Sequence, residues 1–229
     1  LTAFTTYITQ ILMSLMMVSM LFLQLSRALA SSTRITEVLK TDVDLTDENA
    51  GQKDKKVENG RVEFKNVSFK YYEKRKENVL ENISFTAEPG EIVGIIGTTG
   101  SGKSSLVQLI PRLYDVTDGE VLVDGVNVKD YGLKNLRDGV GMVLQKNVLF
   151  SGSIEENLRW GDENATMEEI RAAADAAQAD GFVNAFTDGY NMELGQGGVN
   201  VSGGQKQRLC IARALLKKPK ILILDDSTS

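Results

Sequence analysis

The first 26 positions of the chain are mostly apolar and carry no charge, so that the first charged side chain is Arg27. As a helix, this run reaches about 39 Å, against roughly 30 Å for the hydrocarbon layer of a bilayer. Arg34 and Lys40 follow, opposed only by Glu37, and such a positive excess is typical of the cytoplasmic side of a membrane helix. The pattern therefore predicts a membrane-spanning helix with a cytoplasmic extension over residues 1–40.

A buried helix of a soluble core is the alternative, because polar side chains interrupt the run at Thr5, Thr6, Thr9, Gln10, Ser14 and Gln24. A helix in a membrane bundle carries such residues on its protein-facing side. One face combines glutamine with methionine at alternating spacings of three and four, at Gln10, Met13, Met17, Met20 and Gln24. This face either packs against neighbouring helices or lines a path for a substrate.

The pattern changes after the apolar run. Residues 41–60 carry six acids, three lysines and few apolar side chains, which predicts a solvated linker. From Arg61 onward apolar and polar residues alternate, first in RVEFKNVSFKYY and again in VLENISFTAE, which predicts two antiparallel strands. A charged turn, EKRKEN, separates the two strands, and Pro89-Gly90 forms the turn after the second.

The remainder of the chain alternates between strands and helices. Residues 91–96 are predicted to form a buried strand that feeds a glycine-rich loop, followed by a helix through about Leu113. We further expect a hairpin in GEVLVDGVNV, a core strand in GMVLQ, a small helical subdomain over 166–188, a helix ending near Lys217, and a fully buried strand in ILILDD. These elements predict an α/β fold with an antiparallel β subdomain, a parallel core sheet and an α-helical subdomain.

Composition narrows the classes of protein to which the chain can belong. The net charge of −5 leaves no basic stripe for a phosphate backbone, so nucleic acid is not an expected partner. Cys210 is the single cysteine, which excludes an intramolecular disulfide and fits a reducing compartment; we expect it to be a small buried packing residue. The chain contains no histidine. A membrane-anchored cytosolic domain fits these features best.

The glycine-rich loop carries the first chemical signal. Residues 97–104, GTTGSGKS, match the pattern G-x-x-x-x-G-K-[ST] that binds nucleoside triphosphates. Lys103 is expected to reach the β and γ phosphates, and the Ser104 hydroxyl to ligate Mg²⁺. The backbone closes around the phosphates at Gly97, Gly100 and Gly102. The polar neighbours of this cradle are Thr98, Thr99, Ser101 and Ser105.

Two further motifs follow the loop in a characteristic order. VSGGQ, residues 201–205, lies between the phosphate loop and the final run ILILDD. This combination resembles the ATP-binding cassette (ABC) transporters, and the exporters among them. The resemblance implies the P-loop NTPase cassette of that family, with ATP and Mg²⁺ as cofactors. It also implies that Asp225 holds Mg²⁺ through water, as Walker B aspartates do.

The same resemblance implies roles for other positions. Tyr71 stands where the family's adenine-stacking aromatic lies, with Tyr72 as the alternative, and Gln145 resembles the glutamine that senses the γ-phosphate, binds at the metal and contacts the membrane domain. A helix with Ser202 as its N-cap is expected to begin with the signature, which consists of Ser202, Gly203, Gly204 and Gln205. In this family such a helix end faces the γ-phosphate held by another subunit, so two cassettes sandwich two ATP molecules.

Several features depart from the family pattern. Asp226 stands where the family has glutamate, and a displacement of about 1 Å of the group that positions the attacking water can cost on the order of 100-fold in rate. Gln196 lies near the place of an acidic coupling residue in many exporters. The chain also starts without methionine and stops inside the loop expected after the last strand. We therefore expect both ends to be cut, and any switch histidine to lie beyond residue 229.

The sequence thus predicts the C-terminal part of an exporter half-transporter: a membrane helix over 1–40, a linker over 41–60, and a cassette over 61–229 that is truncated after Walker B. The expected activity is ATP hydrolysis coupled to export of a drug, lipid or peptide across the plasma membrane, with the cassette on the cytoplasmic side. The catalytic candidates are Lys103, Gln145 and Asp226.

Asp226 beside an intact signature resembles the degenerate-site subunit of bacterial heterodimeric multidrug exporters. The expected partners are therefore a second half-transporter subunit, membrane lipid and the transported substrate. The alternative is a nucleotide-gated scaffold that binds ATP without hydrolysing it while its partner does the chemistry.

Overall fold

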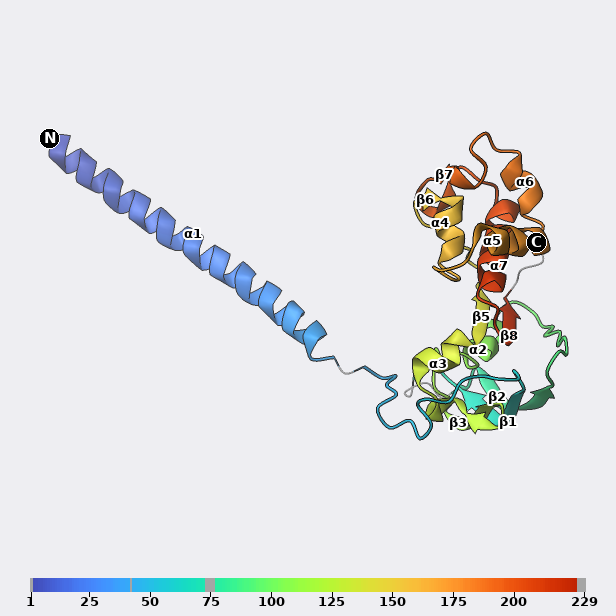
Figure 1. Ribbon diagram of the computed structural model, residues 1–229. Coiled ribbons are helices and arrows are strands. Elements are labelled where there is room, and N and C mark those ends of the chain that lie inside the picture. Colours follow the sequence, from blue (N-terminus) through green and yellow to red (C-terminus); the bar gives the residue numbers. More distant parts are fainter. Residues whose placement is uncertain (1, 42, 73–76, 226–229) are drawn as a thin grey trace. The chain divides into compact units, whose positions relative to one another are not determined.

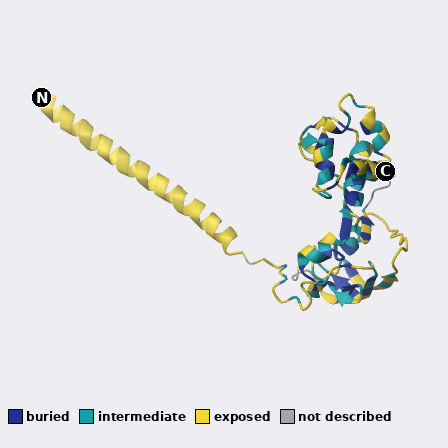
Figure 2. Ribbon diagram, viewed as in Figure 1, coloured by how far each residue is buried: buried dark blue, intermediate teal, exposed yellow. Residues whose placement is uncertain are grey.

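The computed structural model describes residues 2–41, 43–72 and 77–225, and the chain divides into two compact units, Leu1–Asp44 and Leu45–Ser229 (Figure 1). The first unit is one helix, α1 (Thr2–Leu39), all of whose residues are exposed (Figure 2). Its most apolar 18-residue window has a mean hydropathy of 1.8, so its length and composition suit a membrane span.

Hydroxyl side chains of α1 donate hydrogen bonds to carbonyl oxygens one turn earlier. Thr6 Oγ1 lies 2.9 Å from the carbonyl of Thr2, and Ser14 Oγ lies 2.8 Å from that of Gln10. These bonds satisfy the hydroxyl protons inside the helix, which lowers the cost of placing the polar positions of the run in hydrocarbon.

An antiparallel sheet opens the second unit, as the sequence predicts. Its strands are β1 (Val62–Phe69), β2 (Leu80–Ala87), β3 (Asp118–Val123) and β4 (Val126–Asn127), in the order β2-β1-β3-β4. The β3–β4 hairpin turns at Asp124 and Gly125, whose φ angles of 50° and 78° suit the tight turn that matches strand twist. The strands of this sheet contribute Phe64, Phe69 and Val121 to a buried apolar cluster.

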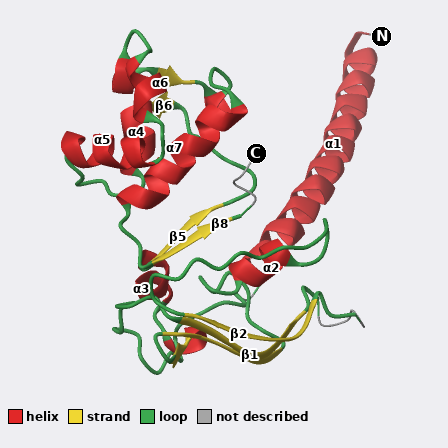
Figure 3. Ribbon diagram, turned by 90° about the vertical axis from the view of Figure 1, so that its right-hand side faces the viewer, coloured by secondary structure: helices red, strands yellow, loops and turns green. Residues whose placement is uncertain are grey.

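A parallel pair, β5 (Val140–Val143) and β8 (Ile221–Leu224), lies between this sheet and a helical group (Figures 1 and 3). The remaining elements are α2 (Lys103–Gln108), α3 (Leu133–Asp138), α4 (Ile154–Arg159), α5 (Met167–Ala176), α6 (Asp180–Asn184), α7 (Gly203–Leu216), β6 (Gly152–Ser153), β7 (Glu193–Leu194) and the 3₁₀ turns Val128–Asp130, Gly189–Asn191 and Gln196–Gly198.

The helical group contains the helices predicted over 166–188, as α5 and α6, together with α4 and α7. Helices α4 to α7 bury one apolar cluster that includes Ile154, Ile170 and Leu209. Cys210 belongs to this cluster, so its prediction as a buried packing residue is confirmed, and burial raises the pKa of its thiol. Helices α4 and α5 each begin with a reciprocal capping box, Ser153 with Glu156 and Thr166 with Glu169.

The structure corrects three predicted elements. Residues 91–96 form a loop without regular secondary structure rather than a buried strand, and Ile92 and Ile96 are 97% and 98% exposed. No described segment pairs with them, and a strand needs a neighbour to satisfy its backbone. In β8, Leu222 and Leu224 are 40% and 48% exposed while their neighbours are buried, so this strand is only half-buried.

The helix after the phosphate loop is the third correction. It ends at Gln108 rather than near Leu113. Pro111 has no N–H to donate to a carbonyl one turn earlier, and Arg112 adopts a left-handed φ of 49°. The apolar pattern continues past Gln108, but the helical conformation of the backbone ends there.

Residues 45–61, here called the strap, belong to the second unit, although most of them are exposed. The Asp124 carboxylate accepts four consecutive backbone N–H groups from the strap, at 2.8 to 3.0 Å, from Glu58, Asn59, Gly60 and Arg61. Partial burial opposes the charge of Asp124, but these four bonds together hold its pKa below the usual value.

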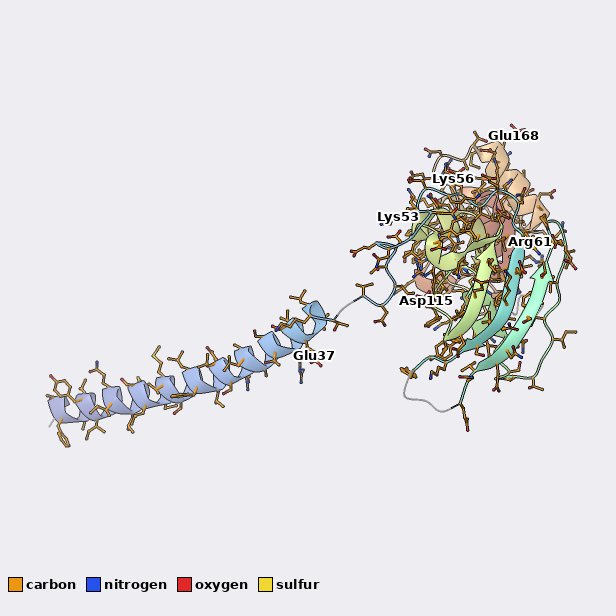
Figure 4. All side chains as sticks on the ribbon, turned by 90° about the horizontal axis from the view of Figure 1, so that it is seen from below. Glu37, Lys53, Lys56, Arg61, Asp115 and Glu168 are labelled. Atoms are coloured by element: carbon orange, nitrogen blue, oxygen red, sulfur yellow. The ribbon has the colours of Figure 1, made fainter. Side chains whose placement is uncertain are left out.

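The strap also contacts α3. The Asp47 carboxylate accepts the N–H of Leu133 at 3.0 Å in the first turn of that helix, and Asn135 Nδ2 donates to the carbonyl of Lys53 at 2.7 Å. Position 132 lies close beneath the strap and suits glycine, which has no Cβ. A Cβ there would lie 2.6 Å from the Lys53 carbonyl oxygen. Figure 4 labels Lys53, Lys56 and Arg61 along this segment. These contacts use mainly the backbone of the strap, and most of its hydrophilic side chains remain exposed.

Candidate functional site

The phosphate loop, residues 97–102, leads directly into α2. Gly100 and Gly102 have φ angles of 84° and 90°, a left-handed conformation that suits glycine. A Cβ at Gly97 would lie 2.5 Å from Ser101 Oγ, so a larger residue there would require that hydroxyl to rotate away. Gly102 is the N-cap of α2 and provides no side-chain cap, so the first N–H groups of the helix can be given to an anion.

Lys103 bends back over this loop. Its Nζ donates to the carbonyl oxygens of Gly97 at 2.6 Å and Thr98 at 3.0 Å. The ammonium group is therefore held where phosphate oxygens would lie if the loop wrapped around a triphosphate. The loop carbonyls hold the lysine in this position without a carboxylate partner in any ion pair that the structure describes.

Ser104 and Asp225 come together although they lie 121 positions apart. Ser104 Oγ donates to Asp225 Oδ1 at 3.0 Å. The N–H of Asp225 donates to the carbonyl of Val143 at 2.9 Å, which fixes the residue at the end of β8 beside the end of β5. A hydroxyl and a carboxylate are suitable oxygen ligands for Mg²⁺, which binds few protein groups and completes its shell with water and phosphate. These residues fit the predicted metal.

Tyr71 is linked to the phosphate helix. Its hydroxyl lies 2.7 Å from Ser105 Oγ, one position beyond Ser104. The ring is 40% exposed and packs edge-on with Phe69 and Tyr114, at centroid distances of 4.8 and 5.1 Å. A ring that is partly exposed and held beside the phosphate loop suits stacking on a base. Tyr72 is 67% exposed.

Gln145 and Asp226 are the two remaining candidates for the chemistry. Gln145 is exposed and lies in the bend that follows β5, two positions after Val143. Since Val143 accepts the Asp225 N–H, this bend leaves the sheet next to Asp225. Asp226 lies outside the described residues, so its assignment as a shortened catalytic base remains a prediction.

The signature opens α7, and Ser202 is its N-cap, as predicted. The Ser202 hydroxyl accepts the Gln205 N–H at 3.3 Å, and Gln205 Oε1 accepts the Ser202 N–H at 2.9 Å. This reciprocal box was not predicted from the sequence, although S-x-x-Q is its known signal. It gives Gln205 a definite structural partner.

Gly203 and Gly204 lie within α7, and a Cβ at either position would meet nothing within 4 Å. Their own fold therefore does not require glycine, although glycine inside a helix costs about 1 kcal/mol relative to alanine. A bare helix N-terminus with no Cβ allows close approach of an outside group, and its free N–H groups favour an anion.

An exposed aromatic pair was also not predicted from the sequence. Phe150 and Trp160 stack at a centroid distance of 4.6 Å, and 44% and 68% of their surfaces are exposed. They border a hollow of about 280 Å³ between β5 and α7, which Arg213 and Lys217 also line. A signal in the sequence could have identified this aromatic pair: segment 150–163 is rich in charged residues but also contains large aromatic side chains.

Comparisons with known proteins show what the chain as a whole is similar to. A family model described as "ABC transporter" matches residues 80–229. The "Uncharacterized ABC transporter ATP-binding protein YfiB" of Bacillus subtilis is 48% identical over 227 residues, which are 99% of this chain and 39% of that protein. The "ATP-dependent lipid A-core flippase" of Pseudomonas aeruginosa is 45% identical over 89% of this chain and 33% of its own length.

Among solved structures, that of a bacterial Atm1-family ABC exporter with ATP bound matches with a TM-score of 0.81 and 35% identity, over 98% of this chain and 39% of that one. The chain therefore spans less than half of the length of these similar proteins.

Proposed function

This chain belongs to the ABC transporter family, and we propose that it is the ATP-binding part of an exporter that couples MgATP binding and hydrolysis to movement of a substrate out of the cytoplasm. The observation that carries the proposal is the hydrogen bond between Ser104 and Asp225. It brings the phosphate loop and the end of β8 together at the point where a metal-bound triphosphate would need both.

Each group of the site then has a role. Lys103 exchanges the carbonyls of Gly97 and Thr98 for β and γ phosphate oxygens, and the N–H groups of α2 bind the same phosphates. Ser104 and, through water, Asp225 would hold Mg²⁺, which would neutralise charge on the phosphates. Tyr71 stacks on the adenine, and Gln145 orients the attacking water.

The signature acts in a different site from the phosphate loop of its own chain. We propose that the bare start of α7 binds the γ-phosphate held by a second cassette, which accounts for two glycines that this chain's fold does not need. Each ATP then lies between the phosphate loop of one subunit and the signature of the other. Closure of two cassettes on ATP and their opening after hydrolysis would drive the membrane domain through α1.

The second subunit is proposed to be a different chain. This chain offers an intact signature but has Asp226 where the family has glutamate. Two copies would form two weak sites, whereas a partner with glutamate would use this signature to form one strong site. The alternative, a scaffold that binds ATP without hydrolysing it, follows from the same residue.

The substrate is proposed to be a drug, lipid or peptide. The polar and methionine face of α1 fits a path for a substrate with both polar and apolar parts, because methionine adapts to irregular apolar surfaces. Similarity to a protein named as a lipid A-core flippase supports an amphipathic substrate.

The test is the steady-state ATPase activity and transport of the full-length protein with its partner subunit. Gly204→Asp places a negative charge against the partner's γ-phosphate and should abolish both activities. Asp226→Asn should do much less, because its site contributes little chemistry. If Asp226→Asn silences the pair as completely as Gly204→Asp, or if the full-length chain alone transports well, the heterodimer is wrong and Asp226 is a working base.

A further inference from the structure

Two buried amide atoms have no hydrogen-bond partner within the described part of the chain: Asn147 Oδ1 and Gln207 Nε2. Gln207 is only 5% exposed. Buried polar atoms are nearly always paired in folded proteins, so each orphan requires an explanation. These two are complementary, since one is an acceptor and the other a donor.

Both atoms belong to segments that pack against each other. The loop after β5, residues 144–150, contains Asn147, and its Val148 carbonyl accepts hydrogen bonds from Arg213 Nη2 at 3.0 Å and from the Cys210 thiol at 3.7 Å, both on α7. Leu149 is 1% exposed and belongs to the same apolar cluster as Leu209.

Gln207 lies on the loop-facing side of α7. It precedes Cys210 by three positions, and residues at this spacing share a helix face. Both side chains are buried, and the thiol of Cys210 already contacts the residue after Asn147. The two orphan atoms therefore lie on the two sides of a single contact, between the loop that carries Gln145 and the helix that carries the signature.

We propose that Asn147 and Gln207 are positioning residues, and that Asn147 Oδ1 accepts a hydrogen bond from Gln207 Nε2 once ATP draws Gln145 toward its γ-phosphate. This inference rests on the proposed function. Asn147 Oδ1 and Gln207 Nε2 are both unsatisfied in the structure, which penalises this arrangement relative to one in which they pair. The bond fixes the start of α7 relative to Gln145, so that the signature is aligned for the partner's site only when this chain holds ATP.

The experiment uses the full-length protein with its partner subunit and three variants. Asn147→Leu and Gln207→Met remove each amide while nearly preserving side-chain shape, and the third variant combines them. Each single variant should lower kcat for ATP about tenfold with the KM for ATP changed less than twofold, and the double variant should be no slower than the slower single variant. The exchange Asn147→Gln with Gln207→Asn, which keeps one donor and one acceptor over the same total length, should restore at least half of kcat.

A second measurement separates positioning from folding. An apolar group in place of an orphan amide removes its burial penalty, so the nucleotide-free variants should melt at the wild-type temperature or above it. Their gain in melting temperature with MgATP should be smaller than that of the wild type. Asn164→Leu, at an exposed amide between α4 and α5, serves as the control and should change neither quantity.

The outcomes distinguish the two proposals. If the wild type neither binds nor hydrolyses MgATP, the proposed function fails and this inference fails with it. If the wild type hydrolyses MgATP but the single variants keep wild-type kcat, melt below the wild type without nucleotide, show losses that multiply in the double variant, or are not rescued by the exchange, only the pairing of Asn147 with Gln207 is wrong.

Discussion

At the scale of single residues, the side chains of the proposed nucleotide site already hydrogen-bond to one another and to the phosphate loop. Lys103 is held by two loop carbonyls, Ser104 by Asp225, and Tyr71 by Ser105. A ligand therefore exchanges hydrogen bonds rather than adding them, and its net gain comes from replacing neutral acceptors by charged phosphate oxygens. The internal bonds also keep each side chain near its binding position before a ligand arrives.

Lys103 is the residue for which this exchange matters most. Lys103→Ala should weaken ATP binding by about 10- to 100-fold, because a charged hydrogen bond contributes on the order of 1.5–3 kcal/mol. Titration of a fluorescent ATP analogue measures the change. Lys134→Ala, at an exposed lysine of α3, is the matched control. Unchanged affinity in the Lys103→Ala protein would remove the basis for the site assignment.

Asp124 is the residue that secures the strap. Asp124→Asn should lower the free energy of unfolding by about 1–3 kcal/mol near pH 7, because an amide is a weaker acceptor for four N–H groups and brings two donors of its own. The pKa of Asp124 is lowered in the folded state, so its carboxylate stabilises the fold above about pH 4 and loses this effect as the pH falls through the folded-state pKa.

The difference between wild type and Asp124→Asn should therefore shrink as the pH is lowered toward about 3. Urea unfolding followed by circular dichroism at several pH values measures it. Asp118→Asn, at an exposed aspartate of β3, should show no such difference. A difference that stays constant with pH would mean that the charge of Asp124 does not hold the strap.

At the scale of whole elements, the two helices of the site use their ends differently. The N-terminus of α2 has no side-chain cap and that of α7 has the Ser202 capping box, whereas cations bind the carbonyl groups that follow α2 and one at the end of α3. The Arg137 guanidinium donates to the carbonyls of Pro111 and Arg112 after α2, at 3.2 and 2.9 Å. Lys217, the C-cap of α7, donates to the carbonyls of Arg137 and Val140. Helix α3 thus connects the far ends of α2 and α7, and the cations suit the negative ends of the helix dipoles.

Removal of the N-cap hydroxyl of α7 distinguishes a structural role of this cap from a role in the reaction. Ser202→Ala and Thr166→Ala each remove the hydroxyl of a capping box, and each should lower stability by about 1 kcal/mol. Only Ser202→Ala should also lower the ATPase activity of the full-length pair, because only α7 is proposed to face a nucleotide. Thermal melts and steady-state turnover measure the two effects. Equal loss of turnover in both variants would mean that the cap of α7 has only a structural role.

At the scale of the whole molecule, no complete catalytic site is expected from a single copy. The phosphate loop and the signature are proposed to serve different ATP molecules, so the 229-residue chain alone should turn over ATP at less than about 1 per second, the lower end of common enzyme rates. Because α1 is apolar and exposed along its length, the chain should also require detergent to remain in solution. Turnover at or above that rate in the purified chain would contradict the two-subunit arrangement.

The Phe150–Trp160 pair makes a second prediction at this scale. An exposed aromatic stack beside a hollow is typical of a contact surface, and we expect it to receive another part of the full-length transporter. Trp160→Ala should leave ATP affinity unchanged and lower transport several-fold, which vesicle transport and nucleotide titration measure together. Wild-type transport by the variant would exclude a role for this surface.

Several signals that depend on neighbouring residues were visible from the chain alone. Pro89-Gly90 and the β3–β4 turn, the apolar run of α1 and the cap of α7 all depend on residues only a few positions apart, so they are visible without the fold. The phosphate loop and the signature belong to the same class, because their chemistry requires short stretches of particular residues.

Tertiary structure decided everything that joins distant segments. The sequence by itself determined that a triphosphate loop, a signature and a carboxylate-ended strand occur in order, but the contact of Ser104 with Asp225, the hold of Asp124 on residues 58–61 and the exposure of Ile92 and Ile96 came from the fold. The physical reason is that local pattern reports which face of an element is apolar, whereas burial and hydrogen-bond partners depend on which other segment lies against that face.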